Sequence, residues 1–198
     1  MRITTLVLIT LLFCSVIFSQ VKADNYAQHK GFKSLAEIES ALNPLEVLAN
    51  HDGIVRSINL NIQFKFGSAE ILPSAQRQID ALGNALKGDK LSSCVIRLTG
   101  HTDATGSSDI NQTLSEQRAN AVKQNLIDSY NITLDKLVAA GKGDSQLLTQ
   151  LPANDARHRR VEVGIVNIEQ CRTNILNNKK ALKKLVTQEK DGKIKIDW

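Results

Sequence analysis

The sequence predicts an α+β fold, a β-α-β-α-β-β two-layer sandwich with helices on one face of a mixed four-stranded sheet. Apolar and polar residues alternate over residues 58–66, which is the period of a strand with one buried face. Two later stretches place apolar residues at helical spacing, and each is followed by a further apolar alternation. The chain has 198 residues, 42% of them apolar and 23% charged, so it can form one such domain with segments at its ends.

A short helix is expected before this domain. Residues 34–37, Ser-Leu-Ala-Glu, have the spacing of a capping box, and apolar residues continue at helical intervals to Leu42. Pro44 is expected to end the helix, and residues 45–55 to form a connector.

The first half of the domain predicts a strand, a helix and a strand. The strand covers residues 58–66 and buries Ile58, Leu60, Ile62, Phe64 and Phe66. Pro73 and Ser74 open a helix that Gly88 stops, and residues 94–98 form a second strand. We expect these two strands to pair in parallel through a right-handed crossover.

The second half predicts a helix and two strands. A polar loop over residues 100–112 leads to a helix of about 16 residues that carries Leu114 and Leu126. A short strand is expected over Leu137–Ala140, and a last strand over residues 161–165.

Residues 1–23 predict a secretory signal peptide. Arg2 precedes an apolar run over residues 6–18, and Val21-Lys22-Ala23 suits cleavage. The mature chain would then begin near Asp24 with no transmembrane span, since the apolar run is too short to cross a bilayer. An uncleaved anchor is the alternative.

The positive charge is concentrated at the carboxyl terminus. Residues 24–198 hold 23 bases and 20 acids, but residues 169–198 alone hold eight bases and four acids. Residues 24–168 are close to neutral, which argues against nucleic-acid binding by the domain. The segments expected are therefore an N-terminal helical segment and connector over 24–55, a domain over 56–168, and a basic helical tail over 169–198.

Two cysteines remain after signal cleavage, Cys94 and Cys171. In an oxidising compartment this even number favours one disulfide, and two buried free thiols are the alternative. Cys94 is in phase with Ile96 and Leu98, and Cys171 keeps the odd parity of Val161 and Val163. Both cysteines are therefore expected to face the core, which agrees with a disulfide but does not establish it.

An acid and a base are expected near the end of the second strand. Asp103 lies in the stretch Gly-His-Thr-Asp-Ala-Thr-Gly of residues 100–106, and Arg118 lies on the helix that follows. Ligand sites of α/β sheets favour this position. The two side chains either form a salt bridge with each other or stand apart and bind a zwitterion, and the residue types alone leave both open.

Several motifs follow one another along the chain: Phe64-Lys65-Phe66-Gly67-Ser68-Ala69-Glu70-Ile71, Gly100-His101-Thr102-Asp103, Asn111, Leu114-Ser115, Arg118-Ala119 and Arg159-Arg160-Val161. In this order they resemble the OmpA-like peptidoglycan-binding domain. The resemblance covers roughly residues 58–168. His158 stands where the family usually has Asn, and Gly143-Asp144 has no nearby Pro.

The resemblance implies non-catalytic binding of peptidoglycan through the diaminopimelate of its stem peptide, with Asp103 and Arg118 holding that residue. It places the protein in the periplasm, associated with the outer membrane or the wall, and anchors it or a partner there. The other implied site residues are Ser68, Thr102, Asn111, Leu114, Ser115 and Arg160.

The sequence also bears on two other classes of function, an enzyme and a protein-binding adaptor. An enzyme is not expected, since the four histidines lack paired ligand spacing and Ser115 has no evident base, so no catalytic residue, metal or cofactor is predicted. The alternative function is a periplasmic adaptor that docks on an envelope protein through its terminal segments, because apolar residues recur among the lysines of the tail.

Overall fold

A computed structural model describes residues 31–45 and 57–190 of the chain. The predicted signal peptide lies outside the described residues, as do most of the connector and the last eight residues of the tail. Residues 33–198 cluster as one compact unit, which holds every element described below. None of the helices in the described part is long and apolar enough to cross a membrane.

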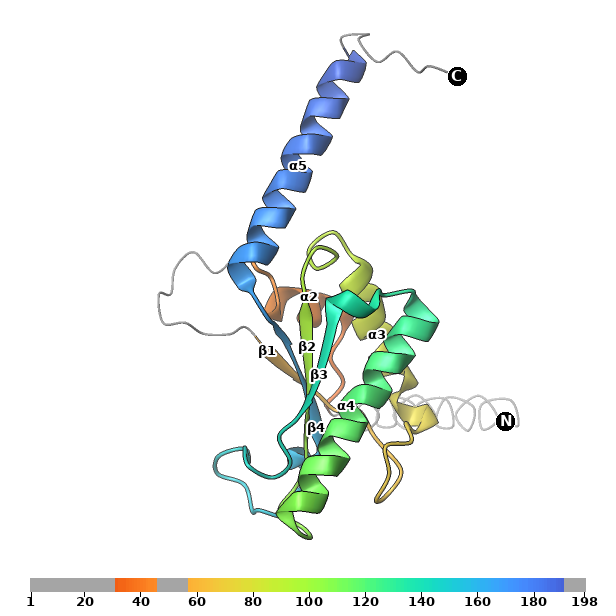
Figure 1. Cartoon of the computed structure of the whole chain (residues 1–198), viewed down its shortest axis with the longest axis vertical. Helices are drawn as coiled ribbons and strands as arrows, with labels where there is room; N and C mark the ends of the chain where they lie inside the picture. The colour runs from red at the N-terminus through yellow and green to blue at the C-terminus, as the bar shows by residue number, and fades with distance from the viewer. Residues whose placement is uncertain (1–30, 46–56, 191–198) are drawn as a thin grey trace, which may run out of the picture. The chain divides into compact units, whose positions relative to one another are not determined.

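The described unit contains helices and a sheet in the predicted order (Figure 1). A capping box opens the first helix as expected, with the Ser34 hydroxyl accepting from the Glu37 N–H. The elements are α2 (Leu35–Ala41), β1 (Ser57–Leu60), α3 (Gln76–Lys87), β2 (Ile96–His101), α4 (Ser108–Tyr130), β3 (Leu137–Gly141), β4 (Arg160–Ile165) and α5 (Ile168–Lys190).

The strands form a mixed four-stranded sheet in the order β1-β4-β2-β3, which confirms the predicted fold class. β4 runs antiparallel to both β1 and β2, and β2 pairs with β3 in parallel. The expected pairing of the first two strands was wrong: β1 and β2 point the same way, but β4 lies between them.

The two faces of the sheet differ in character. Leu98 pairs with Val163, and both are buried on the face covered by α3 and α4 (Figure 1). Neighbouring residues point the other way, so Thr99 and Glu162 belong to the opposite, polar face. His101 pairs with Arg160 on that polar face.

The first strand is shorter than its alternation predicts. β1 ends at Leu60, and the chain then forms a hairpin in which Phe64 makes an isolated bridge with Ile71. Ile62 is buried and Phe64 half-buried, but Phe66 at the tip of the hairpin is 100% exposed. The expectation that Phe66 lies in the core was therefore wrong. The alternation of apolar and polar residues continues past the end of the strand into a turn that leaves the sheet.

The helix before the third strand starts earlier than expected. α4 has 23 residues and begins at Ser108, because the Ser107 hydroxyl accepts from the Ile110 N–H and caps it. It ends at Asn131, which has a left-handed backbone. The predicted loop thus contains the first turn of α4.

A close contact fixes α4 against the sheet. Gly100 and Gly141 are opposite each other in the parallel ladder. A Cβ on Gly100 would lie 2.1 Å from the Ser115 carbonyl oxygen, and one on Gly141 would lie 2.5 Å from the Ser115 Oγ. The two glycines therefore allow the amino-terminal half of α4 to lie directly on β2 and β3.

The carboxyl-terminal helix begins against the domain and is covalently attached to it. A disulfide joins Cys94 to Cys171, and both residues are buried. Ile175 on the next turn is buried as well, and Asn174 donates to the Ser93 carbonyl. Cys171 lies on a helix, so the argument from strand parity was wrong although the pairing it favoured is present.

Farther along α5, apolar side chains are exposed. Leu176, Leu182 and Val186 are exposed to 44%, 61% and 50% respectively. Leu182 and Val186 lie among lysines, beyond Asn178, whose Nδ2 donates to the Ser93 hydroxyl.

We predict that the disulfide makes a large contribution to stability. It closes a sequence separation of 77 residues, for which chain entropy gives about 4 kcal/mol. Replacing both Cys94 and Cys171 by Ala should lower the free energy of unfolding in urea by about that amount. Native protein kept without reductant should show no free thiol on labelling in denaturant, and full labelling at both positions would contradict the prediction.

Candidate functional site

The candidate site lies at the carboxyl end of β2, where the chain turns toward α4. The turn is bonded to the connection between β3 and β4 at two points. Thr102 N–H donates to the Gly143 carbonyl at 2.9 Å, and Ala104 N–H donates to the Ala153 carbonyl at 2.9 Å. The position of Asp103 between these two bonds is therefore set by the backbone.

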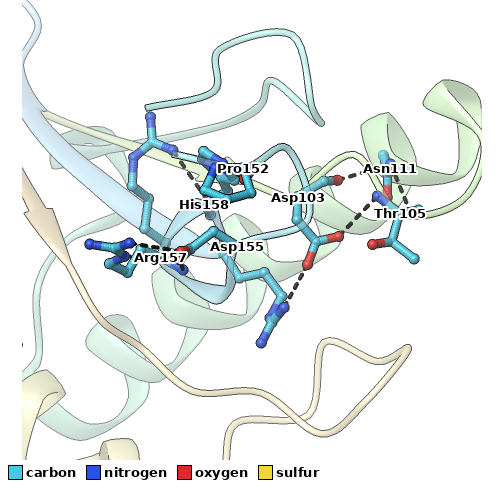
Figure 2. A network of polar contacts seen from close by, with 9 residues as sticks. Asp103, Thr105, Asn111, Pro152, Asp155, Arg157 and His158 are labelled. Atoms are coloured by element: carbon cyan, nitrogen blue, oxygen red, sulfur yellow. Dashed lines mark hydrogen bonds and ion pairs between the residues drawn. The ribbon is translucent and has the colours of Figure 1, made fainter. Parts of the chain in front are cut away.

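The Asp103 carboxylate is almost buried and already has two partners (Figure 2). Its Oδ1 accepts from the Thr105 N–H at 3.0 Å, and its Oδ2 accepts from Arg159 Nη1 at 2.5 Å. Burial acts to raise the pKa of Asp103, but the bonds from Arg159 and Thr105 outweigh it and hold the pKa below its usual range. Asp103 is therefore ionised at neutral pH.

Asn111 holds the turn in place from the first turns of α4 (Figure 2). Its Nδ2 donates to the carbonyl oxygens of Asp103 and Thr105, both at 3.2 Å, and contacts Asp144 Oδ2 at 3.4 Å. The residue is buried, so Asn111 positions Asp103.

Arg118 lies two turns farther along α4 and is held by the hairpin that follows β1. Its Nε donates to the Ser68 carbonyl at 3.0 Å, and its guanidinium carbon lies 5.1 Å from the centre of the Phe64 ring. The residue is only 7% exposed. Burial and the like charge of Arg159 lower the pKa of Arg118, while Asp103 acts in the opposite direction.

Asp103 and Arg118 do not pair with each other. No ion pair or hydrogen bond joins them, and the terminal nitrogens of Arg118 donate to no residue in the described part of the chain. The two charges still interact through space, because the negative charge of Asp103 acts to raise the pKa of Arg118. The arrangement thus leaves a cation and an anion near each other without a direct bond between them.

An open pocket of about 370 Å³ is lined by residues of the hairpin turn and of α4, and neither Asp103 nor Arg118 is among them. It lies between the turn of the hairpin and the amino-terminal half of α4, and Leu114 forms part of its wall. Its other lining residues are Gly67, Asp109, Ile110, Thr113 and Gln117.

The remaining predicted site residues lie at different depths. Ser68 contributes its backbone carbonyl to Arg118. Ser115 is fully buried, with its hydroxyl donating to the Gln112 carbonyl and accepting from the Gly143 N–H. Thr102 is buried too, and its hydroxyl has no partner among the described residues. The structure does not bring Ser115 or the Thr102 side chain to the surface.

The structure separates the two neighbouring arginines. Arg159 reaches Asp103, whereas Arg160 points to the polar face of the sheet and donates to Asn59, the His158 carbonyl and the Gln146 carbonyl. Burial lowers the pKa of Arg160. Arg160 thus braces strands and a loop, and Arg159 is the basic side chain next to Asp103.

Two histidines stabilise the surrounding structure. His158 is fully buried, accepts at Nδ1 from the Leu148 N–H at 3.0 Å, and donates from Nε2 to the Pro152 carbonyl at 2.8 Å. His101 contacts Glu162 at 3.1 Å across the sheet. Burial is the main cause of the lowered pKa of His101. No group of three metal-ligating side chains is assembled in residues 31–45 and 57–190.

About half of this chain is similar to known proteins. The model of the OmpA family matches residues 63–160. Outer membrane protein A of Buchnera aphidicola (subsp. Schizaphis graminum) is 33% identical over 122 residues, which are 56% of this chain and 35% of that protein. Outer membrane porin F of Pseudomonas aeruginosa is 30% identical over 110 residues, 54% of this chain and 31% of that protein. The chain spans about a third of the length of these curated relatives.

A solved structure is also similar. The structure of an outer membrane protein from Borrelia burgdorferi B31 is 30% identical, with a TM-score of 0.45. The match covers 60% of this chain and 93% of that one.

We predict that Asn111 stabilises the fold through the turn. Replacing Asn111 by Ala removes buried hydrogen bonds and should lower the free energy of unfolding by about 1–3 kcal/mol in urea titration. Asn120 on the same helix is exposed and donates to the Glu116 carbonyl, so Asn120→Ala is the matched control and should cost less than about 0.5 kcal/mol. Equal losses in the two variants would contradict the role given to Asn111.

Proposed function

The chain belongs to the OmpA family through residues 63–160, and we propose that it binds cell-wall peptidoglycan without catalysing a reaction. The ligand is the diaminopimelate of the stem peptide, held by Asp103 and Arg118. Two lines support this function: the motifs that resemble the peptidoglycan-binding domain, and the geometry around those two side chains.

The observation that carries the proposal is that two largely buried, opposite charges have no direct bond to each other. The free end of diaminopimelate carries an ammonium and a carboxylate on one carbon. The carboxylate can accept from the terminal nitrogens of Arg118, and the ammonium can donate to Asp103. A salt bridge between the two side chains would have occupied the terminal nitrogens of Arg118. Asp103 is paired with Arg159, but its carboxylate keeps lone pairs that can accept from an ammonium.

The residues around Asp103 and Arg118 favour binding of such a ligand. Arg118 is fixed by Ser68 and Phe64, so little conformational entropy is lost when its terminal nitrogens bind a ligand. The pocket beside Leu114 offers an apolar wall for the methylene groups of the ligand. A few charge-assisted bonds give modest affinity at one site, and the repeating polymer raises retention through rebinding.

We place this activity in the periplasm, at the outer membrane or the wall. The predicted signal peptide and the disulfide support an oxidising compartment outside the cytoplasm. Wall binding there would anchor this chain, or a partner attached to it.

A second candidate function is docking on an envelope protein. The observation that favours it is the exposure of Leu182 and Val186 among the lysines of α5. These residues take no part in the site, so an adaptor role is compatible with wall binding. Retention on sacculi that persists in Asp103 and Arg118 variants but is lost at high salt would show electrostatic binding by the basic tail in place of recognition of the stem peptide.

We predict that neutralising either charge removes most wall binding. Asp103→Asn and Arg118→Gln should each reduce retention on purified sacculi at least about tenfold, because each removes a charge-assisted bond to the ligand. Co-sedimentation with sacculi measures the bound fraction.

Matched controls separate this effect from a change in net charge. Asp128→Asn alters an exposed acid on α4, and Arg97→Gln alters an exposed base on the polar face of the sheet. Both controls should bind as the unaltered protein does. Retention of Asp103→Asn and Arg118→Gln at control levels, with the fold intact by circular dichroism, would contradict the proposal.

We also predict discrimination between two kinds of wall. Lysine in the stem peptide keeps the side-chain ammonium but lacks the neighbouring carboxylate, so Arg118 loses its partner. Walls with diaminopimelate should retain the protein about tenfold better than walls with lysine, and Arg118→Gln should abolish the difference. Equal retention on both walls would show that diaminopimelate is not what is recognised.

A further inference from the structure

Two guanidiniums, those of Arg118 and Arg159, lie near the Asp103 carboxylate. Arg118 and Arg159 both influence the surroundings of Asp103, and the like charge of Arg159 is one cause of the lowered pKa of Arg118. The Asp103 carboxylate is the anion between them, with Arg159 Nη1 at 2.5 Å from its Oδ2.

Of the other carboxylates around this end of the sheet, three have partners of their own, and Asp109 lines the open pocket beside Leu114. Asp155 pairs with Arg157 at 2.7 Å, and Glu162 pairs with His101 on the polar face. Asp144 accepts from the Ser108 hydroxyl and from Asn111. Asp103 is thus the carboxylate that Arg159 contacts directly.

A ligand with one ammonium and one carboxylate occupies Asp103 and Arg118 and offers no partner to Arg159. Its ammonium neutralises Asp103 and its carboxylate neutralises Arg118, which leaves Arg159 without a full counter-charge. The Arg159 side chain is 48% exposed, and its Nη1 bond to Asp103 leaves other guanidinium nitrogens able to donate. Arg159 can therefore reach a bound ligand without moving away from the site.

We propose that Arg159 is a specificity-determining residue that binds a second carboxylate of the ligand. The inference rests on the proposed function. The site then binds a ligand end with two carboxylates for each ammonium more tightly than an isolated amino-acid zwitterion. In a stem peptide the second carboxylate comes from a neighbour of diaminopimelate, either the α-carboxylate of the preceding D-glutamate or the terminal carboxylate of the following D-alanine.

Calorimetric titration of the full chain with synthetic stem peptides tests this. The reference peptide is L-Ala-γ-D-Glu-meso-diaminopimelate-D-Ala, and two further peptides carry an amide in place of the glutamate α-carboxylate or of the alanine carboxylate. The proteins are the unaltered chain, Arg159→Gln and Arg159→Lys. Arg157→Gln, two residues away and with the same change of charge, is the matched control.

One of the two amides should weaken binding to the unaltered chain about fivefold, and it identifies the source of the second carboxylate. Arg159→Gln should bind the amide and the reference peptide equally, Arg159→Lys should regain part of the difference, and Arg157→Gln should behave as the unaltered chain. A role of Arg159 in folding alone would not make the variant insensitive to one ligand group.

Three results would overturn the inference. In the first, the unaltered chain is insensitive to both amides; in the second, Arg159→Gln keeps the full sensitivity. In the third, Arg159→Gln binds the reference peptide more tightly, which would make Arg159 a competitor for Asp103. In each of these cases the retention on sacculi still tests the proposed function separately. A chain that binds neither sacculi nor any of the peptides would remove both.

Discussion

The account depends on the separation of two opposite charges, Asp103 and Arg118, in a region from which most water is excluded. Each side chain is held by other groups: the carboxylate by Thr105 and Arg159, the guanidinium by Ser68 and the Phe64 ring. Direct collapse into a salt bridge would require both to leave these partners. Since partly buried charges interact strongly and are poorly screened, a ligand that supplies the complementary charges gains more here than on an open surface.

The fold maintains this separation through the position of α4. The glycine pair of β2 and β3 allows the helix to lie on the sheet at Ser115, and Arg118 is one turn farther along. Asn111 ties the turn that carries Asp103 to the same helix. Both charges are thus set against one rigid element, and the hairpin after β1 supports Arg118 from elsewhere in the chain.

Much of the fold could be predicted from the sequence because its signals are local. Hydrophobic period identified the strands and helices, and the capping box at Ser34 is a local hydrogen-bond pattern. Predictions were wrong where the tertiary structure departs from the local sequence pattern. Phe66 continues the alternation of β1 but lies at the tip of a hairpin, and Cys171 keeps strand parity but lies on a helix.

In the candidate site too, the local sequence pattern predicted some side-chain positions and not others. A strand sends successive residues to opposite sides, so the parity of Val161 already indicated that Arg160 points to the polar face. Its neighbour Arg159 belonged to the same motif and is the residue that reaches Asp103. The burial of Ser115 follows from Gly100 and Gly141, which are far apart in sequence, and only their pairing in the sheet makes the close contact predictable.

The most direct measurement is a titration with free meso-diaminopimelate followed by nuclear magnetic resonance at the side chains of Asp103, Arg118 and Arg97. The account predicts saturable shifts of the Asp103 carboxyl carbon and the Arg118 guanidinium nitrogens with one dissociation constant, and no shift at Arg97. A response at Arg118 without one at Asp103, or the absence of saturation at both, would contradict it.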